Sequence, residues 1–146
     1  CLSDFDLKIW GPEWGRRCKR NQVIMRAWQK RAIFGQEFAR AVKCTQVNLN
    51  IIDPTNYPAA NMRFFEIPMA GGVQVASACP EMADTFRHGE HLFYYASIDE
   101  LPDRIASLLK DEERRNEVAA AAHAQVLAGH TYTHRARAIL QHLEEA

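Results

Sequence analysis

Residues 45–77, TQVNLNIIDPTNYPAANMRFFEIPMAGGVQVAS, decide the fold of this chain. Residues 45–52 alternate apolar and polar side chains and end in two isoleucines, which predicts a β-strand. After a proline-containing loop, a helix is predicted to begin near Asn61 and to be broken by Gly71-Gly72. The apolar run 73–77 then predicts a second, buried strand. A strand, a helix and a strand in this order indicate a parallel βαβ unit.

The alternation of strands and helices continues on both sides of this unit. Downstream, the pattern predicts a short helix over 80–86, a strand over 92–96, and helices over 97–110, 111–127 and 131–145. Upstream, it predicts strands over 7–10 and 31–34, a short helix or an irregular connector over 22–30, and a helical stretch over 36–43. The expected helix boundaries are a capping box at Ser97 and Glu100, N-caps at Asp111 and Thr131, and a terminating Gly129.

Five short apolar strands alternating with helices predict an α/β fold, a Rossmann-like doubly wound parallel sheet with flanking helices. Residues 1–146 are long enough for one such domain, and we expect a single one. In this architecture the ligand binds in a crevice at the carboxyl ends of the strands. The loop before Asn61 follows the carboxyl end of the strongest strand, so we expect the site there.

Three polar residues around the start of the predicted Asn61 helix suit a nucleotide. Asn61 is expected to cap the helix, whose N-terminus favours a phosphate, and Arg63 adds a planar cation in the first turn. Glu66 lies three residues further on, where its carboxylate could accept hydrogen bonds from ribose hydroxyls. Two alternatives stay open: Arg63 and Glu66 form an i,i+3 ion pair, or both are ordinary surface residues of the helix.

Four motifs in order extend this interpretation to a family: Asn61-Met-Arg63 with Phe65-Glu66 and Gly71-Gly72, then Gly89-Glu-His-Leu-Phe-Tyr-Tyr95, Ser97-Ile-Asp-Glu-Leu101 and His130-Thr-Tyr-Thr-His-Arg135. Over nearly the whole chain they resemble the C-terminal domain of GT-B glycosyltransferases. The resemblance is specifically to the CgeB-like (spore maturation protein) group of family-1-type glycosyl transferases. It implies a nucleotide-diphosphate sugar as donor and a hydroxyl group as acceptor.

The resemblance also implies roles for individual residues. Glu66 matches the second glutamate of a Glu-x7-Glu pattern, which holds the ribose in retaining GT-B enzymes. The first position of the pattern is Pro58, so recognition of the donor sugar must come from other residues. Phe34 and Gly35 match the loop that passes the nucleotide base. No catalytic residue is assigned, and the nucleotide, with uridine diphosphate as the working choice beside guanosine and thymidine, stays open.

Two further features have a simple structural interpretation beside the one that the family implies. Gly71 and Gly72 terminate a helix and allow a tight turn, and in the family this turn lies near the donor. The last helix, over 131–145, is expected to pack toward an N-terminal domain that binds the acceptor and is absent from this chain. Without that domain, the chain is expected to bind donor weakly and to turn over nothing.

Composition excludes several other functions. Formal net charge is zero, with 18 basic and 18 acidic residues, which argues against binding nucleic acid. No apolar run is long enough for a transmembrane segment, and the start lacks a signal peptide and an initiator Met, so we expect a cytoplasmic piece of a longer chain. The cysteines and histidines lack metal-ligand spacing, so we expect no metal or other cofactor. A solvated basic loop is expected at Arg16, Arg17, Lys19 and Arg20, although one of these could reach the diphosphate.

Two rival functions remain. A glycosyltransferase-like module kept only for binding or assembly is favoured by the missing glutamate at Pro58. A receiver-like signalling domain would need an acidic pair after the first strand, whereas Asp4 and Asp6 precede it. The second rival is therefore the weaker one.

Overall fold

The computed structural model describes residues 2–145, which form an α/β domain around a three-stranded parallel sheet. The strands are β1 (Asn48–Asn50), β2 (Gln74–Ser77) and β3 (Phe93–Tyr95), in the order β1-β2-β3. In the register, Leu49 lies opposite Val75, which in turn lies opposite Phe93. Helices flank this sheet, so the predicted Rossmann-like fold class is confirmed.

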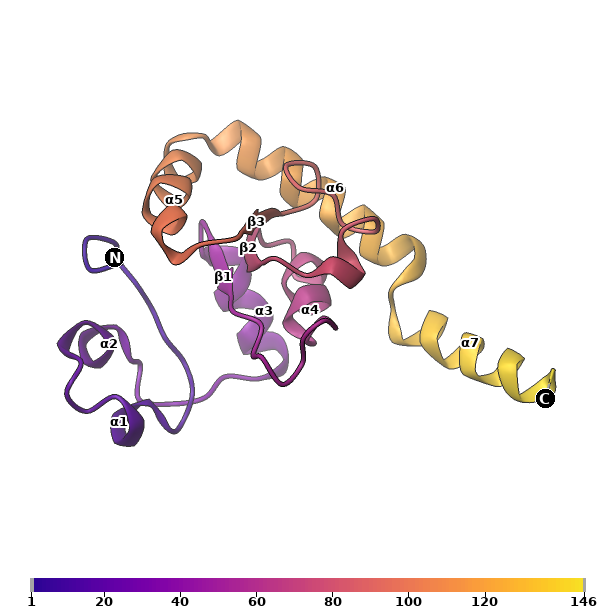
Figure 1. Ribbon diagram of the computed structural model, residues 1–146, viewed down its shortest axis with the longest axis horizontal. Helices are drawn as coiled ribbons and strands as arrows, with labels where there is room; N and C mark the ends of the chain where they lie inside the picture. The colour runs from indigo at the N-terminus through magenta and orange to yellow at the C-terminus, as the bar shows by residue number, and fades with distance from the viewer. Residues whose placement is uncertain (1, 146) are drawn as a thin grey trace.

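The helices are α1 (Trp14–Arg17), α2 (Gln22–Ala27), α3 (Gly35–Cys44), α4 (Arg63–Met69), α5 (Leu101–Lys110), α6 (Glu112–Gly129) and α7 (Tyr132–Glu144). Short 3₁₀ turns cover Pro80–Met82 and Ile98–Glu100. Figure 1 shows α6 running along the domain, α7 extending away from it, and α1 and α2 in a separate N-terminal lobe. The sheet therefore lies in the middle of the chain, between two peripheral segments.

Two apolar clusters cover the two faces of the sheet, because successive side chains of a strand point to opposite sides. On one face, Ala76 of β2 packs with Phe64 of α4 and Val126 of α6. On the other face, Val75 packs with the α5 residues Ile105 and Leu108. The sheet is thus buried on both faces, as a parallel sheet requires.

Local signals in the sequence fix the ends of several helices. The Asp111 carboxylate accepts a hydrogen bond from the Arg114 N–H at 2.9 Å, and Thr131 accepts one from the His134 N–H at 3.4 Å. Both predicted N-caps are confirmed. At the end of α4, the Gly71 N–H donates to Pro68 O at 2.9 Å and the Gly72 N–H to Ile67 O at 3.0 Å. With φ of +77° at Gly71, this is a Schellman termination, and the predicted glycine break is confirmed.

The two strands predicted before α3 are wrong. Residues 7–10 form only an isolated parallel bridge between Ile9 and Trp28, outside the sheet, and residues 31–34 form no strand. Local packing of tryptophan takes the place of sheet pairing: the Trp28 Nε1–H donates to Gly11 O at 2.7 Å, and the Trp28 ring lies directly over Gly15. The described chain therefore has three strands in the sheet where five were predicted.

Smaller boundary predictions also need correction. Residues 80–86 form a 3₁₀ turn and further turns in place of a helix. Ser97 caps through the Asp99 N–H, so a 3₁₀ turn precedes α5. Gly129 is the last residue of α6, with His130 as its C-cap, so this glycine lies inside the helix end that it was expected to follow.

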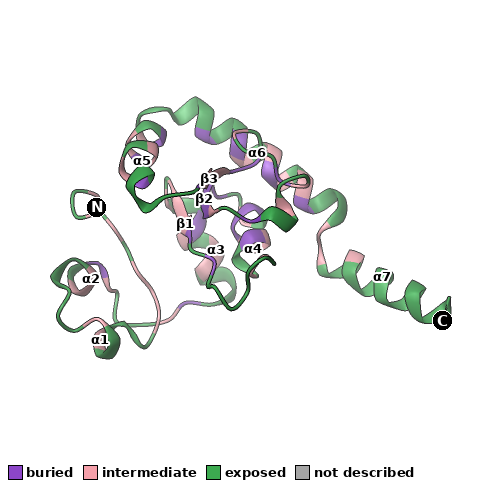
Figure 2. Cartoon of the chain, in the orientation of Figure 1, coloured by how far each residue is buried: buried purple, intermediate pink, exposed green. Residues whose placement is uncertain are grey.

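Helix α7 is the most exposed element of the fold. None of its residues is buried, and Figure 2 shows it almost entirely in the colour of exposed residues. Its larger apolar side chains lie at Tyr132, Ile139, Leu140 and Leu143, each more than half exposed. This spacing places them along one side of the helix.

Candidate functional site

Three buried or half-buried amides lie at the end of β1. Asn50 is the last residue of the strand and is only 3% exposed. Its side chain exchanges two hydrogen bonds with Asn61, at 2.9 and 3.1 Å, and donates a third to Gln74 Oε1 at 3.1 Å. The side-chain amide nitrogen of Gln74, Nε2, is buried without a partner among the described residues. This network fixes the start of α4 against the carboxyl end of the sheet.

Asn61 performs the predicted capping role. Its Oδ1 accepts a hydrogen bond from the Phe64 N–H at 3.2 Å, while its Nδ2 donates to Asn50. The orientation of this amide is therefore set on both sides. Sequence reasoning found the cap from residue type and position, but it did not identify Asn50 as the residue that orients it.

Arg63 and Glu66 lie together on the first turn of α4. Their side chains form an i,i+3 ion pair, and the Arg63 guanidinium also lies over the Phe38 ring of α3, with its Cζ 4.4 Å from the ring centroid. The two side chains are 46% and 34% exposed, so solvent and a ligand can reach both. The ion pair left open by the sequence is thus present in the structure.

Phe34 and Gly35 lie about one helical turn before Phe38, whose ring contacts Arg63. They stand at the start of α3, with Gly35 at φ of +53° and Phe38 beneath Arg63. The Phe34 side chain is 77% exposed, so it is not a core residue. The structure therefore places Asn61, Arg63 and Glu66 together at the start of α4, while Phe34 and Gly35 begin the helix whose Phe38 ring contacts Arg63.

Gly71 and Gly72 lie at the other end of α4. Seven helical residues separate them from Asn61 and Met62, roughly 10 Å along the helix axis. A Cβ on Gly72 would lie 2.5 Å from Val42 Cγ1, so this glycine permits close packing of α3 against the β2 entry. The structure does not bring these glycines together with Arg63 and Glu66, and it gives them a structural role in the turn.

The junction of α6 and α7 contributes residues that sequence reasoning left without a binding role. His130 stacks on the Phe65 ring, with centroids 5.7 Å apart and planes inclined by 25°. The Arg135 guanidinium lies over the same ring, 4.6 Å from its centroid. Partial burial lowers the pKa of His130, and the nearby charges of Arg135 and His134 lower it further. The sequence signal for this contact was Phe65, the aromatic residue that directly precedes Glu66.

Two hydroxyl groups mark the carboxyl ends of β2 and β3. The Ser77 and Tyr95 hydroxyls are 2.9 Å apart, and Ser77 Oγ accepts a hydrogen bond from the Ile52 N–H at 3.1 Å. Sequence reasoning did not identify either residue. The signal available for Ser77 was that it is the polar last residue of the predicted strand 73–77.

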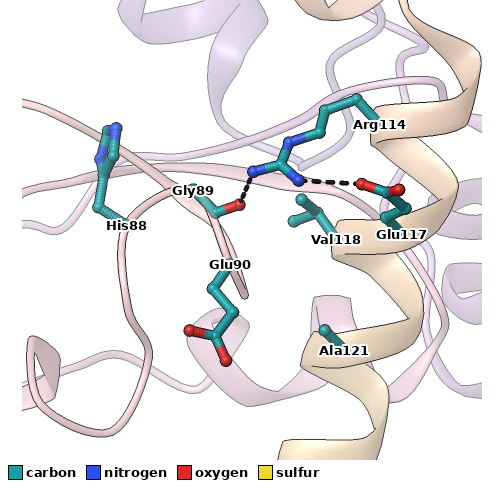
Figure 3. Close-up of a pocket in the computed structure, with 7 residues that line it drawn as sticks. All are labelled: His88, Gly89, Glu90, Arg114, Glu117, Val118 and Ala121. Atoms are coloured by element: carbon teal, nitrogen blue, oxygen red, sulfur yellow. Dashed lines mark hydrogen bonds and ion pairs between the residues drawn. The ribbon is translucent and has the colours of Figure 1, made fainter.

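A cavity of about 410 Å³ lies at the opposite edge of the sheet, where the chain enters β3. It lies between the loop before β3 and the first turns of α6 (Figure 3), and it is lined by His88, Gly89, Glu90, Arg114, Glu117, Val118 and Ala121. Arg114 is held by Glu117 and by Gly89 O, and Glu90 pairs with Arg87. Arg114 and Glu117 thus pair with each other within this cavity, and Glu90 pairs with a residue outside its lining.

The predicted basic loop lies in the N-terminal lobe. Arg16 and Arg17 both pair with Glu13 on the exposed surface. Residues 7–10 do not form a strand of the sheet. No strand of the sheet therefore carries this basic cluster to the carboxyl edge. Among residues 2–145, no three His, Cys, Asp or Glu side chains are close enough to share a metal ion.

Comparison with known protein families gives one match. Residues 2–141 match the family model described as glycosyl transferase-like. No curated protein and no solved structure matches the chain. Within the described residues, no helix combines the length and the apolar character needed to cross a membrane.

Proposed function

The chain belongs to the glycosyl transferase-like family, and from this premise we propose that it binds the sugar donor of a GT-B glycosyltransferase. The domain corresponds in this proposal to the C-terminal half of the enzyme, of the CgeB-like type. The donor is a nucleotide-diphosphate sugar, and the sugar is transferred to a hydroxyl group of the acceptor. The nucleoside diphosphate leaves.

The Arg63–Glu66 pair beside the carboxyl end of β1 is the observation that carries the proposal. Glu66 accepts hydrogen bonds from the ribose hydroxyls, and Arg63 donates to the diphosphate. Separating the two side chains costs little, because an exposed ion pair contributes only about 0–1 kcal/mol. The ligand then replaces the single contact between Arg63 and Glu66 with two contacts, one to each side chain.

Phe34 is the proposed contact for the nucleotide base. Its ring is largely exposed and stands one turn from Phe38, over which Arg63 lies. Stacking of a base on an aromatic ring contributes about 1–3 kcal/mol and tolerates different bases. Gly35 beside it leaves room, because a Cβ there would meet no atom within 4 Å.

Stabilisation of the leaving group follows from the same residues. Negative charge develops on the diphosphate as the bond to the sugar breaks, and fixed cations beside it lower the barrier. Arg63 is the cation of α4 in position for this, and the proposal assigns the role to side chains and to no metal ion. The acceptor is not bound by this domain.

The exposed apolar side of α7 is the proposed contact with an N-terminal acceptor-binding domain of the same protein. Tyr132, Ile139, Leu140 and Leu143 form this side, and all are more than half exposed. Burying such side chains contributes about 1.5–3 kcal/mol for each. The donor would then bind in the cleft between the two domains.

One observation favours a second candidate, a binding module without catalytic activity. Pro58 occupies the position where retaining GT-B enzymes carry the first glutamate, and a proline side chain cannot hold a sugar hydroxyl. Such a module would retain nucleotide binding at Glu66, or lose it altogether.

Isothermal titration with uridine, guanosine and thymidine diphosphates tests the proposal. We expect one of them to bind the wild-type chain, and Glu66→Gln to weaken that binding about 10-fold, as for loss of a hydrogen bond to a charged group. Glu117→Gln is the matched control, because Glu117 also pairs with an arginine at i,i+3 spacing but lies in the cavity at the other edge. Equal effects of the two substitutions would contradict the assignment of Glu66.

A further inference from the structure

Arg135 is a cation without a carboxylate partner among residues 2–145, although it lies beside the proposed donor site. Its guanidinium is held over the Phe65 ring, and Phe65 directly precedes Glu66. The other residues at this junction are His130, stacked on the same ring, and His134, which caps back onto Thr131. Nothing in this cluster neutralises the charge of Arg135.

The start of α4 lies between two arginines that are held in the same way. Arg63 lies over Phe38 of α3, with its Cζ 4.4 Å from the ring centroid, and Arg135 lies over Phe65 at 4.6 Å. Residues 63 and 65 are about 200° apart around a helix, so the two guanidiniums flank the first turn from different sides. The charge of Arg63 is shared with Glu66, whereas Arg135 pairs with no carboxylate of residues 2–145.

Stacking leaves the hydrogen-bonding groups of a guanidinium available. The face of the group contacts the ring, while its five N–H donors point outward in the plane. An arginine held in this way is oriented before a ligand arrives, so less side-chain entropy is lost on binding. The Thr131 cap holds the turn that carries Arg135, because the Arg135 N–H donates to Thr131 O at 3.2 Å.

Building on the proposed function, we propose that Arg135 binds the diphosphate of the donor together with Arg63. The donor site then spans α4 and the first turn of α7, and it is not confined to the βαβ unit. Its ligand chemistry is a diphosphate with two or more negative charges, which two planar cations recognise through paired hydrogen bonds. Arg135 therefore contributes to affinity for the diphosphate and not for the nucleoside.

The test compares a nucleoside diphosphate with its nucleoside on the full chain. Each of the uridine, guanosine and thymidine pairs is titrated by calorimetry into wild type, Arg135→Gln, Arg135→Lys and Arg137→Ala. Arg137 is the matched control, since it is an exposed arginine two residues further along α7. We expect Arg135→Gln to weaken diphosphate binding about 10-fold or more and to leave nucleoside binding unchanged, with a smaller loss for Arg135→Lys.

Each outcome separates this inference from the function on which it rests. Wild-type and Arg135→Gln chains that bind the diphosphate equally would overturn the role of Arg135 and leave the donor site intact. An equal loss for diphosphate and nucleoside would also overturn it, because a misplaced helix α7 would explain that result. Failure of the wild type to bind any diphosphate would overturn the donor site itself.

Discussion

At the scale of single residues, Gly72 occupies a position in the sheet region that has little room for a side chain. A Cβ there would lie 2.5 Å from Val42 Cγ1 and 2.7 Å from Asn48 Nδ2. We expect Gly72→Ala to lower the free energy of unfolding by about 1–3 kcal/mol, through overpacking between α3 and the β2 entry. Urea unfolding followed by circular dichroism measures this change.

Gly129 provides the opposite control on another helix. It is the last residue of α6, and a Cβ there would meet nothing within 4 Å. Gly129→Ala should therefore leave stability unchanged or raise it by about 0.5–1 kcal/mol. Equal destabilisation by both substitutions would show that the packing around Gly72 is not the cause.

The side chain of Asn50 makes three hydrogen bonds, two with Asn61 and one with Gln74. Removing this side chain should therefore leave polar atoms of both partners unpaired. Asn50→Ala leaves Gln74 and Asn61 with unpaired polar atoms, which should cost about 1–3 kcal/mol of stability. Asn56→Ala, in the exposed loop before α4, should stay within about 0.5 kcal/mol of wild type. Unfolding curves that shift equally for the two variants would rule out the buried network as a source of stability.

His130 should make stability depend on pH. Its pKa in the folded protein is lowered by burial and by Arg135 and His134, so the unfolded chain binds a proton more readily. Stability is then fully present above the usual histidine pKa of about 6.5 and falls as pH decreases below it. We expect the free energy of unfolding to fall between pH 7 and pH 5.

Substitution separates His130 from His88, whose pKa is also lowered, chiefly by burial. His130→Asn should reduce the slope of stability against pH in urea unfolding between pH 5 and pH 7, and His88→Asn with His130→Asn should reduce it further. An unchanged slope in the double variant would contradict the assignment of this dependence to the two rings.

The roles of several residues could be predicted from the sequence because these roles depend on close neighbours in the chain. Roles that depend on contacts between distant parts of the chain could not be predicted. The cap at Asn61, the i,i+3 pair of Arg63 with Glu66 and the Gly71 turn depend on neighbours within a few residues. The contact of Arg135 with Phe65 joins residues 70 positions apart in the numbering, and no local pattern marks it.

At the scale of elements, the two N-caps predict different consequences for the helices that they begin. Helix α6 buries Val118, Ala122 and Val126, whereas α7 buries no residue. Asp111→Ala should therefore lower global stability by about 1 kcal/mol, because the cap and its charge at the start of a packed helix are both lost. Thr131→Ala should fray α7 with little change in global stability.

Hydrogen exchange together with urea unfolding distinguishes these two effects. Faster exchange in Thr131→Ala should be confined to the first turns of α7, with an unchanged unfolding midpoint. A global loss in Thr131→Ala as large as in Asp111→Ala would contradict the view that α7 stands apart from the core.

The strands of the central sheet could be predicted from the sequence. The two strands predicted for the N-terminal lobe do not form. The apolar runs behind β1, β2 and β3 are bounded by turn residues and alternate with clear helical patterns, so length and period agree. Residues 7–10 have a similar apolar pattern, but Ile9 forms only an isolated bridge with Trp28, whose ring N–H donates a hydrogen bond to Gly11 O. A short apolar run alone does not distinguish a strand of the sheet from such a bridge.

At the scale of the whole molecule, the two edges of the sheet have different chemistry. The carboxyl edge gathers an exposed aromatic ring, a half-exposed ion pair and Arg135, which has no carboxylate partner in the described part of the chain, whereas the cavity at the opposite edge contains the Arg114–Glu117 pair. The proposed donor site therefore lies where the parallel topology predicts it. Family membership extends over residues 2–141 and includes most of α7, which agrees with a role for that helix in the same protein.

The most direct test of this account is an NMR titration of the ¹⁵N-labelled chain with uridine, guanosine and thymidine diphosphates. We expect one nucleotide to produce saturable shifts of the backbone amides of Gly35, Asn61, Arg63 and Glu66, and Glu66→Gln to weaken this binding. Shifts confined to Gly89, Arg114 and Glu117 around the cavity at the opposite edge, or no shifts with any of the three, would contradict it.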